Sequence, residues 1–171
     1  MIKPSIIDSF KSHKIVDYDT AINHISEIKK KNKTVGLCHG QFDLLHPGHI
    51  KHFESARKLC DCLFVSITSD NFVTSRKGHG RPIFSDKLRA YSIACVEFVD
   101  FVVISDFNLG IEVIKILKPS YYIKGPDYIN KDDPEINAEI AAIKSVGGKT
   151  KYTNDPKLST TEIIQHIKEK I

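Results

Sequence analysis

Long apolar runs are missing from this sequence of 171 residues. No uninterrupted stretch approaches the roughly 20 apolar residues that a membrane-spanning helix needs. The first residues, MIKPSIIDSFKSHK, also lack the apolar core of a secretory signal peptide. We therefore expect no membrane partner and a protein that works in the cytoplasm.

Cysteine is scarce, with four residues at positions 38, 60, 62 and 95. All four fall in apolar segments, which is typical of reduced, buried thiols rather than of a disulfide framework. Cys60 and Cys62 have the wrong spacing for a zinc knuckle, and no second Cys or His pair has finger-like spacing. We predict that all four cysteines are core residues.

Charge is not concentrated in any part of the chain. The formal net charge is +4, and the lysines are scattered rather than interleaved with aromatic residues. This mild basic bias favours an anionic small molecule as a partner and argues against nucleic acid. No internal repeat or low-complexity tract is present. The length and the 41% hydrophobic content suit one core. We expect a single domain over residues 15–171, preceded by an arm or tail at 1–14.

Five apolar, β-branched runs alternate with amphipathic stretches and predict five strands. Helix start and stop signals lie between these runs. Strands and helices that alternate at this spacing indicate an α/β, Rossmann-like, doubly wound fold: a mostly parallel five-stranded sheet with helices on both faces. The predicted strands are 34–39, 63–68, 100–105, 121–125 and 149–153; the helix signals are Pro47, the caps Ser85 and Asn108, Asp133 with Pro134, and the stop Gly147–Gly148, with further helices at 19–31 and 160–169.

Three polar clusters follow predicted strands. In a doubly wound sheet, ligands bind beyond the carboxyl ends of the strands, where loops meet the N-termini of helices. The clusters are GQFDLLHPGHIKHF (40–53), SDNFVTSRKGHGRP (69–82) and KLSTTEI (157–163). We therefore expect all three to contribute to one ligand site.

The first cluster and the residue before it contain four histidines, His39, His46, His49 and His52, which raises the question of a metal site. Zinc hydrolase helices place two histidines four residues apart with a glutamate between them, whereas His46 and His49 are three apart with proline and glycine between them. A second alternative is a structural one, in which His46 only caps the helix and His49 is a partly exposed side chain. Neither alternative accounts for the whole string.

A phosphate site explains the string better. Gly40 permits a close backbone approach, Pro47 begins the helix without wasting a donor, and Gly48 leaves space beside the free N–H groups of the first turn. His46 and His49 can point from one side of that turn toward the same phosphate and donate from their imidazole nitrogens.

The string GQFDLLHPGH resembles the signature of the HxGH nucleotidyltransferase superfamily, which includes cytidylyltransferases for glycerol 3-phosphate and ethanolamine phosphate. The chain is also similar, from about Lys14 onward, to the adenylyltransferase domain of bifunctional ADP-heptose synthase. SITSD, KGHGRPI, Arg89, IKGPDY and LSTTEII match in the same order. The resemblance implies transfer of a nucleoside monophosphate from an NTP to a small phosphorylated acceptor, with release of pyrophosphate.

The resemblance also assigns roles to residues of this chain. His46, His49, Lys124 and Arg89 would be catalytic, and Asp43 and Asp127 would face the acceptor. Arg81 and Arg89 would clamp phosphate, since guanidinium forks suit phosphate oxygens; the alternative is that the Arg76–Arg81 loop is only a solvated turn. The nucleotide-binding residues would be Gly40, Gln41, Phe42, Gly48, Arg81, Gly125, Ser159, Thr160 and Thr161.

The S-T-T segment has two compatible interpretations. Ser159 with Glu162 three residues later forms a capping box. Hydroxyl and free N–H groups beside such a terminus also suit the β- and γ-phosphates. Just upstream the chain departs from the glycerol-phosphate enzymes, with Asn154 and Lys157 where those enzymes have arginine and glycine. Pro126 likewise replaces a second glycine of the heptose enzymes.

From these motifs we favour ATP with a sugar phosphate such as heptose 1-phosphate, giving an NDP-sugar. CTP with a polyol or alcohol phosphate such as glycerol 3-phosphate is the alternative, and a non-catalytic nucleotide-binding regulatory module is an alternative of another class. Mg²⁺ is expected because it bridges NTP phosphates, and no protein metal ligand is predicted. Homodimerisation, which is common among relatives, is also expected.

Overall fold

The computed structural model describes residues 4–77, 80–156 and 158–170, without the side chains of Pro4, Ser5 and Lys77. Its centre is one sheet of five strands in the order β3-β2-β1-β4-β5. Every neighbouring pair is parallel, as the alternation of strands and helices predicted. The strands are β1 (Val35–Gly40), β2 (Cys62–Thr68), β3 (Phe101–Ser105), β4 (Tyr121–Lys124) and β5 (Lys149–Tyr152).

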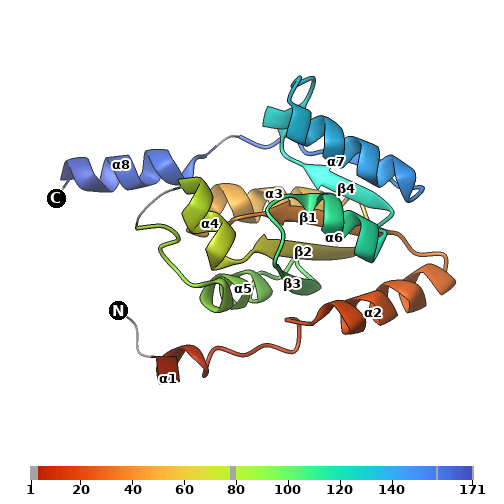
Figure 1. Cartoon of the computed structure of the whole chain (residues 1–171), viewed down its shortest axis with the longest axis horizontal. Coiled ribbons are helices and arrows are strands. Elements are labelled where there is room, and N and C mark those ends of the chain that lie inside the picture. The colour runs from red at the N-terminus through yellow and green to blue at the C-terminus, as the bar shows by residue number, and fades with distance from the viewer. Residues whose placement is uncertain (1–3, 78–79, 157, 171) are drawn as a thin grey trace.

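Helices cover both faces of the sheet, which confirms the doubly wound architecture (Figure 1). Alternate residues of each strand point to opposite faces, so each strand contributes side chains to a hydrophobic core on either face of the sheet. Leu37 and Phe64 pack beneath one set of helices, and Cys38 and Val65 pack beneath the other. The first set is α2 (Tyr18–Lys30), α6 (Gly110–Leu117) and α7 (Pro134–Ser145), and the second is α3 (Pro47–Arg57) and α5 (Asp86–Ala94).

Two of the predicted helix caps act differently from expectation. Asp133 caps α7 as predicted, since its carboxylate accepts from the N–H groups of Glu135 and Ile136. Asn108 was predicted to cap α6, and this is wrong: the cap position is Leu109, and the Gly110 N–H donates to Glu139 at 2.9 Å. Ser85 occupies the cap position of α5, but its side chain makes no capping bond.

Some helical segments were not predicted. Residues after β2 form α4 (Asp70–Lys77), where a polar loop was expected, and Val73 anchors that helix in the core. A 3₁₀ turn, η1 (Pro126–Tyr128), follows β4, and a short helix α1 (Pro4–Ile7) lies near the N-terminus. These elements are too short to show a helical period in the sequence.

The segment before α2 packs along the β3 edge of the sheet. The N–H of Val16 donates to the carbonyl of Val102 at 2.9 Å, beside a parallel bridge between Ile15 and Val102. The Phe10 ring lies edge-on to Tyr91 with centroids 5.1 Å apart. Residues 6–14 therefore lie against the body as an arm, although the proposed domain boundary at 14/15 remains a prediction.

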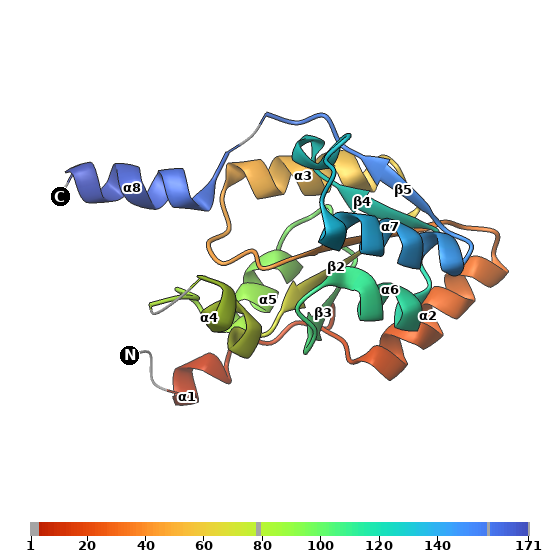
Figure 2. The ribbon, with the colours of Figure 1, turned by 45° about the horizontal axis from the view of Figure 1, so that its top comes forward.

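The last helix, α8 (Thr160–Lys170), extends away from the rest of the molecule in both ribbon views (Figure 2). It contains no buried residue. Its capping box forms as predicted: Ser159 Oγ accepts from the Thr161 N–H, and Glu162 accepts from the Ser159 N–H at 3.3 Å. Local capping rather than packing therefore holds its first turn.

The cysteine prediction holds for part of the set. Cys38 and Cys62 are buried and Cys60 is partly buried, and burial raises the pKa of Cys60 to about 11 and that of Cys62 to about 12. These thiols are therefore protonated near neutral pH. Cys95 is exposed, which contradicts its prediction as a core residue. Cys95 is the C-cap residue of α5 and faces solvent, whereas its neighbours Ala94 and Val96 are buried in the core.

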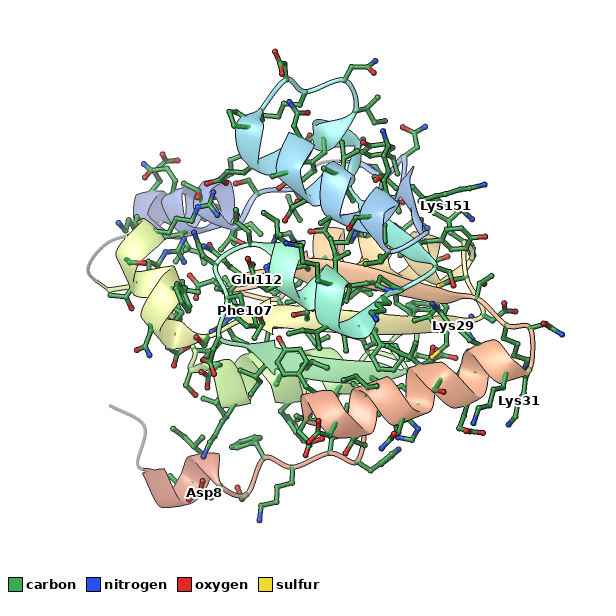
Figure 3. All side chains as sticks on the ribbon, turned by 45° about the vertical axis from the view of Figure 1, so that its right-hand side comes forward. Asp8, Lys29, Lys31, Phe107, Glu112 and Lys151 are labelled. Carbon is green, nitrogen blue, oxygen red and sulfur yellow. The ribbon has the colours of Figure 1, made fainter. Side chains whose placement is uncertain are left out.

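Part of the basic charge lies far from the carboxyl ends of the strands. Figure 3 shows Lys29 and Lys31 at the end of α2, where the chain turns into the start of β1. The Lys29 ammonium donates to the carbonyl of Lys118 at 2.5 Å. Within the described ranges, no helix is long and apolar enough to cross a membrane.

Candidate active site

A cleft of about 680 Å³ lies at the carboxyl edge of the sheet. Residues that follow each of the five strands line it, together with residues on α3 and α7. This is the place where open parallel sheets bind ligands, and all three predicted polar clusters reach it. We call the side formed by α3 and the chain after β5 the α3 wall, and the side formed by β1, β2 and β4 beneath α6 and α7 the α7 wall.

The loop that leads into α3 has an unusual backbone. Phe42 has a φ of 44°, in the left-handed region that non-glycine residues rarely adopt. Its ring packs over Gly40, where an added Cβ would meet that ring at 3.0 Å. Gly40 therefore makes room for Phe42, which in turn lies edge-on to His49 with centroids 5.2 Å apart.

His46 and His49 come together as the sequence predicted. Their rings stack with centroids 3.7 Å apart, and both residues line the cleft. His46 occupies the cap position of α3 through its backbone only, because its side chain makes no capping bond. The alternative in which His46 caps the helix is therefore met by its backbone alone, and its imidazole is left for another role.

The imidazole of His46 is buried without using its nitrogens. It is 5% exposed, and neither Nδ1 nor Nε2 has a hydrogen-bond partner among the described residues. Burial lowers its pKa below the ordinary value, so the ring is neutral near pH 7. Buried polar groups without partners are costly, and a neutral imidazole keeps one N–H to donate. This site suits an anionic oxygen supplied by a ligand.

The chain after β5 closes the α3 wall. A Cβ on Gly48 would meet Leu158 Cβ at 2.9 Å and the His46 ring at 3.0 Å, so only glycine lets these groups approach. Thr160, at the start of α8, also lines the cleft. Of the S-T-T residues, Thr160 is thus placed in the cleft lining, and its neighbours Ser159 and Thr161 form the cap beside it.

Side-chain bonds fasten this chain to α3. His52 Nδ1 lies 2.9 Å from Thr153 Oγ1, and Ser55 Oγ donates to Asp155 at 2.7 Å. Burial lowers the pKa of His52, so its ring is neutral as well. His52 therefore joins α3 to the chain that follows β5. Among the described residues, no group of three or more His, Cys, Asp or Glu side chains could hold a metal ion.

The α7 wall is built on an ion pair. The Lys124 ammonium donates to Glu139 at 2.7 Å and lies 4.2 Å from the centroid of the Tyr128 ring. Both charged side chains are nearly inaccessible, at 11% for Lys124 and 4% for Glu139. Burial alone would raise the pKa of Glu139, but the charge and hydrogen bond of Lys124 hold it below its ordinary value.

Glu139 is a residue that sequence reasoning missed. Besides Lys124 it accepts the Gly110 N–H at 2.9 Å, so one carboxylate joins β4 to the start of α6. A Cβ on Gly110 would meet Tyr122 Oη at 2.5 Å and Glu139 at 3.0 Å. The sequence offered only a weak signal for it: Glu139 lies on the same face of α7 as the apolar residues Ile136 and Ile143.

Asp43, Arg81 and Arg89 form a scaffold behind the cleft. Asp43 lines the cleft but is 1% exposed, and it accepts from Arg81 at 2.5 Å and from the Ile83 N–H at 2.6 Å. The Arg89 guanidinium is 2% exposed and donates to the Gln41 and Phe84 carbonyls and to Asp70. Neither arginine is among the cleft-lining residues. Both support the loop that carries the histidines.

The remaining predicted residues have varied surroundings. Gln41, Gly125 and Asp127 line the cleft. No atom lies within 4 Å of a Cβ added to Gly125, so nothing in the described structure requires a glycine there. Lys157, which stands where the glycerol-phosphate enzymes have glycine, and Gly78–His79 of the Arg76–Arg81 loop lie outside the described residues, as does the Lys77 side chain.

Comparison with known proteins identifies the family of the chain. The model of the cytidylyltransferase-like family matches residues 37–166. The chain is 38% identical over 167 residues to a protein of Campylobacter jejuni named bifunctional protein HldE, covering 95% of this chain and 35% of that one. A bifunctional protein HldE of Syntrophotalea carbinolica is 34% identical over 165 residues, covering 91% and 33%. The chain thus spans about a third of the length of these relatives.

Two solved structures share the fold. A lipopolysaccharide core biosynthesis protein from Thermoplasma volcanium superimposes with a TM-score of 0.57 at 25% identity, covering 74% of this chain and 99% of that one. A pantoate-beta-alanine ligase from Francisella tularensis gives a TM-score of 0.51 at 16% identity, covering 92% and 77%. The second likeness concerns the fold alone.

Proposed function

The chain belongs to the cytidylyltransferase-like family, and from this premise we propose that it is a nucleotidyltransferase that forms an NDP-sugar. The observation that carries the proposal is the stacked pair of His46 and His49 at the N-terminus of α3, with both nitrogens of His46 buried and without a partner among the described residues. A phosphate supplies the acceptor oxygens that the His46 ring lacks among the described residues, and the dipole of α3 adds to the same attraction.

The reaction needs no covalent enzyme intermediate. An oxygen of the acceptor phosphate attacks the α-phosphorus of the NTP, and the bond from that phosphorus to the bridging oxygen of the β-phosphate breaks. Pyrophosphate leaves with the electron pair of that bond. The attacking oxygen is already anionic near neutral pH, so positioning and charge neutralisation supply most of the rate. His46 and His49 stabilise the charge that develops on the α-phosphate.

Other residues hold the nucleotide and the loop. The loop before α3 and the first turn of that helix face the phosphates through the backbone of Gly40, Gln41, Phe42 and Gly48. The start of α8 faces the β- and γ-phosphates through Ser159, Thr160 and Thr161. Lys124 and Gly125 border the reacting groups from the opposite wall, and Asp127 borders the acceptor. We assign Arg81, Arg89 and Asp43 to positioning the histidine loop, because their side chains are bonded to protein groups.

ATP and a sugar phosphate such as heptose 1-phosphate are our proposed substrates. The basic loop ending in Arg81 and the IKGPDY segment support this choice. The likeness to a lipopolysaccharide core biosynthesis protein from Thermoplasma volcanium is consistent with a sugar product. The description of the family model supports a second candidate, CTP with a polyol or alcohol phosphate.

The proposal includes Mg²⁺, which would bind together with the triphosphate of the NTP. It keeps several waters and bridges phosphate oxygens, so it requires few protein ligands. That preference fits a cleft whose described residues contain no preformed cluster of metal-binding side chains. The ion would neutralise charge on the leaving pyrophosphate.

Homodimerisation and a cytoplasmic location complete the proposal. Light scattering of the purified chain tests homodimerisation.

Pyrophosphate release tests the proposed function. ATP, CTP, GTP and UTP are each mixed with Mg²⁺ and with heptose 1-phosphate, other sugar 1-phosphates or glycerol 3-phosphate. A signal with ATP and a sugar phosphate is expected, and His46→Ala and His49→Ala should abolish it while remaining folded. A signal with CTP and glycerol 3-phosphate would favour the second candidate. Nucleotide binding without turnover on any acceptor would leave a non-catalytic regulatory module instead.

A further inference from the structure

We infer that His39, Thr68 and Asn108 form a subsite for the uncharged hydroxyl groups of the acceptor, on the α7 wall; the inference rests on the proposed function. Each of the three lines the cleft. Each also has a buried polar atom without a hydrogen-bond partner among the described residues: Nε2 of His39, Oγ1 of Thr68 and Oδ1 of Asn108. Such atoms need partners, and a ligand in the cleft can supply them.

The strand pattern explains why these groups gather. Val35 and Leu37 of β1 belong to the core beneath α2, α6 and α7, and the next residue on that face is His39. On β2 the same face carries Phe64, then Ser66 and Thr68. Two adjacent strands therefore change from apolar to polar side chains together, at the edge where the cleft begins.

Hydrogen bonds within the fold orient one member of the set. His39 Nδ1 lies 3.2 Å from Ser66 Oγ, on the neighbouring strand, so Nε2 is the ring nitrogen without a hydrogen-bond partner among the described residues. Burial lowers the pKa of His39 to about 4, so the ring is neutral under ordinary conditions. The subsite therefore presents an imidazole, a hydroxyl and an amide oxygen, all uncharged.

Two pairs of oppositely charged side chains in the cleft lining are bonded to each other. Lys124 is bonded to Glu139, and Arg76 forms an ion pair with Glu135 among the cleft-lining residues. A cationic acceptor group, such as the amine of ethanolamine phosphate, would find no uncompensated carboxylate in these pairs. A sugar or polyol offers several hydroxyls, each able both to donate and to accept, and it suits uncharged partners of mixed character.

The direction of attack places the acceptor rather than the leaving group here. In phosphoryl and nucleotidyl transfer, the attacking and leaving oxygens lie roughly in line across the reacting phosphorus. The proposed seat of the β- and γ-phosphates is the start of α8, beside the α3 wall and after β5, the edge strand on one side of β1. The acceptor must therefore approach from the opposite side, where the ends of β1 and β2 carry His39 and Thr68.

Two acceptors that differ in hydroxyl content test the subsite. Pyrophosphate release is measured with ATP and either heptose 1-phosphate or methyl phosphate, for the wild type, Thr68→Val and Asn108→Ala. We expect kcat/KM for heptose 1-phosphate to fall about 3- to 10-fold in each variant, the usual effect of losing one neutral hydrogen bond. The values for methyl phosphate and the KM for ATP should stay within about twofold, because neither uses the lost group.

Thr150→Val is the matched control. Thr150 also has a buried hydroxyl without a partner among the described residues, but it lies on β5 and is not among the cleft-lining residues. It should leave the kcat/KM values for both acceptors unchanged.

Equal losses of kcat/KM for the two acceptors, or a change confined to the KM for ATP, would overturn the subsite while leaving the proposed function standing. If glycerol 3-phosphate with CTP is the working pair, it replaces heptose 1-phosphate and ATP with the same expectations. If the wild-type chain turns over no combination of NTP and acceptor, both the subsite and the proposed function are overturned.

Discussion

On the α3 wall, the imidazole of His46 is buried with neither nitrogen bonded to a described residue. On the α7 wall, the ammonium of Lys124 and the carboxylate of Glu139 are equally buried but bond each other at 2.7 Å. The His46 ring depends on a ligand for its hydrogen-bond partners, whereas Lys124 and Glu139 find theirs within the fold. The difference predicts that removing the His46 ring affects turnover and that breaking the Lys124–Glu139 pair affects stability.

The largest effect is expected from breaking the ion pair. Lys124→Met leaves the Glu139 charge buried without its partner, which should lower the free energy of unfolding by about 3–5 kcal/mol. Urea denaturation measures the change. The double variant Lys124→Met with Glu139→Gln removes both charges and should recover part of the loss. A single variant as stable as the wild type would contradict the dependence of this wall on its pair.

On the opposite wall, His46→Ala should leave stability nearly intact and reduce kcat. Loss of one donor to a developing charge costs about 100- to 1,000-fold in kcat. Removal of the ring deprives no protein group of a hydrogen bond, since the ring nitrogens have no partner among the described residues. Pyrophosphate release and thermal unfolding are measured side by side. His24→Ala is the control, because His24 is exposed and stacks on Phe101 outside the cleft; loss of turnover in the control would indicate a general disturbance.

A pH titration of stability sharpens the comparison. His39 titrates at about 4 in the folded chain and near 6.5 when unfolded, so the unfolded state binds the proton first. Stability should therefore be fully present above pH 6.5 and should fall as the pH drops toward 4. The loss due to this residue can reach about 3 kcal/mol. His39→Asn should flatten that part of the profile in urea titrations; an unchanged slope would assign the pH dependence to other groups.

The smallest effect is expected at the start of α8. Ser159→Ala removes the hydroxyl that caps the helix, at a local cost of about 1 kcal/mol. Because α8 contains no buried residue, the global unfolding midpoint should hardly move, and only amide exchange within residues 160–170 should quicken. Hydrogen exchange by mass spectrometry resolves the two responses. A lowered midpoint would mean that α8 is packed against the body in solution.

Predictions that depended on local pattern were the most accurate. All five strands appear within two residues of their predicted bounds, because alternating or continuous apolar runs record burial directly. The helix beginning at Pro47 and the caps at Asp133 and Ser159 formed because their signals act over three or four residues. Asn108 failed as a cap because Glu139, 29 residues later in the chain, bonds the Gly110 N–H instead.

The parallel α/β sheet and the approach of His46 to His49 follow from the amino-acid sequence alone, since periodicity and a helical separation of three residues are local properties. Which charged side chains bond to one another depends on tertiary packing. Arg89 is bonded behind the histidine loop, Lys124 is bonded to Glu139, and Asp43 is bonded to Arg81. A residue's type shows what it can bind, whereas its bonding partner depends on which distant segments the packed core brings within about 3 Å.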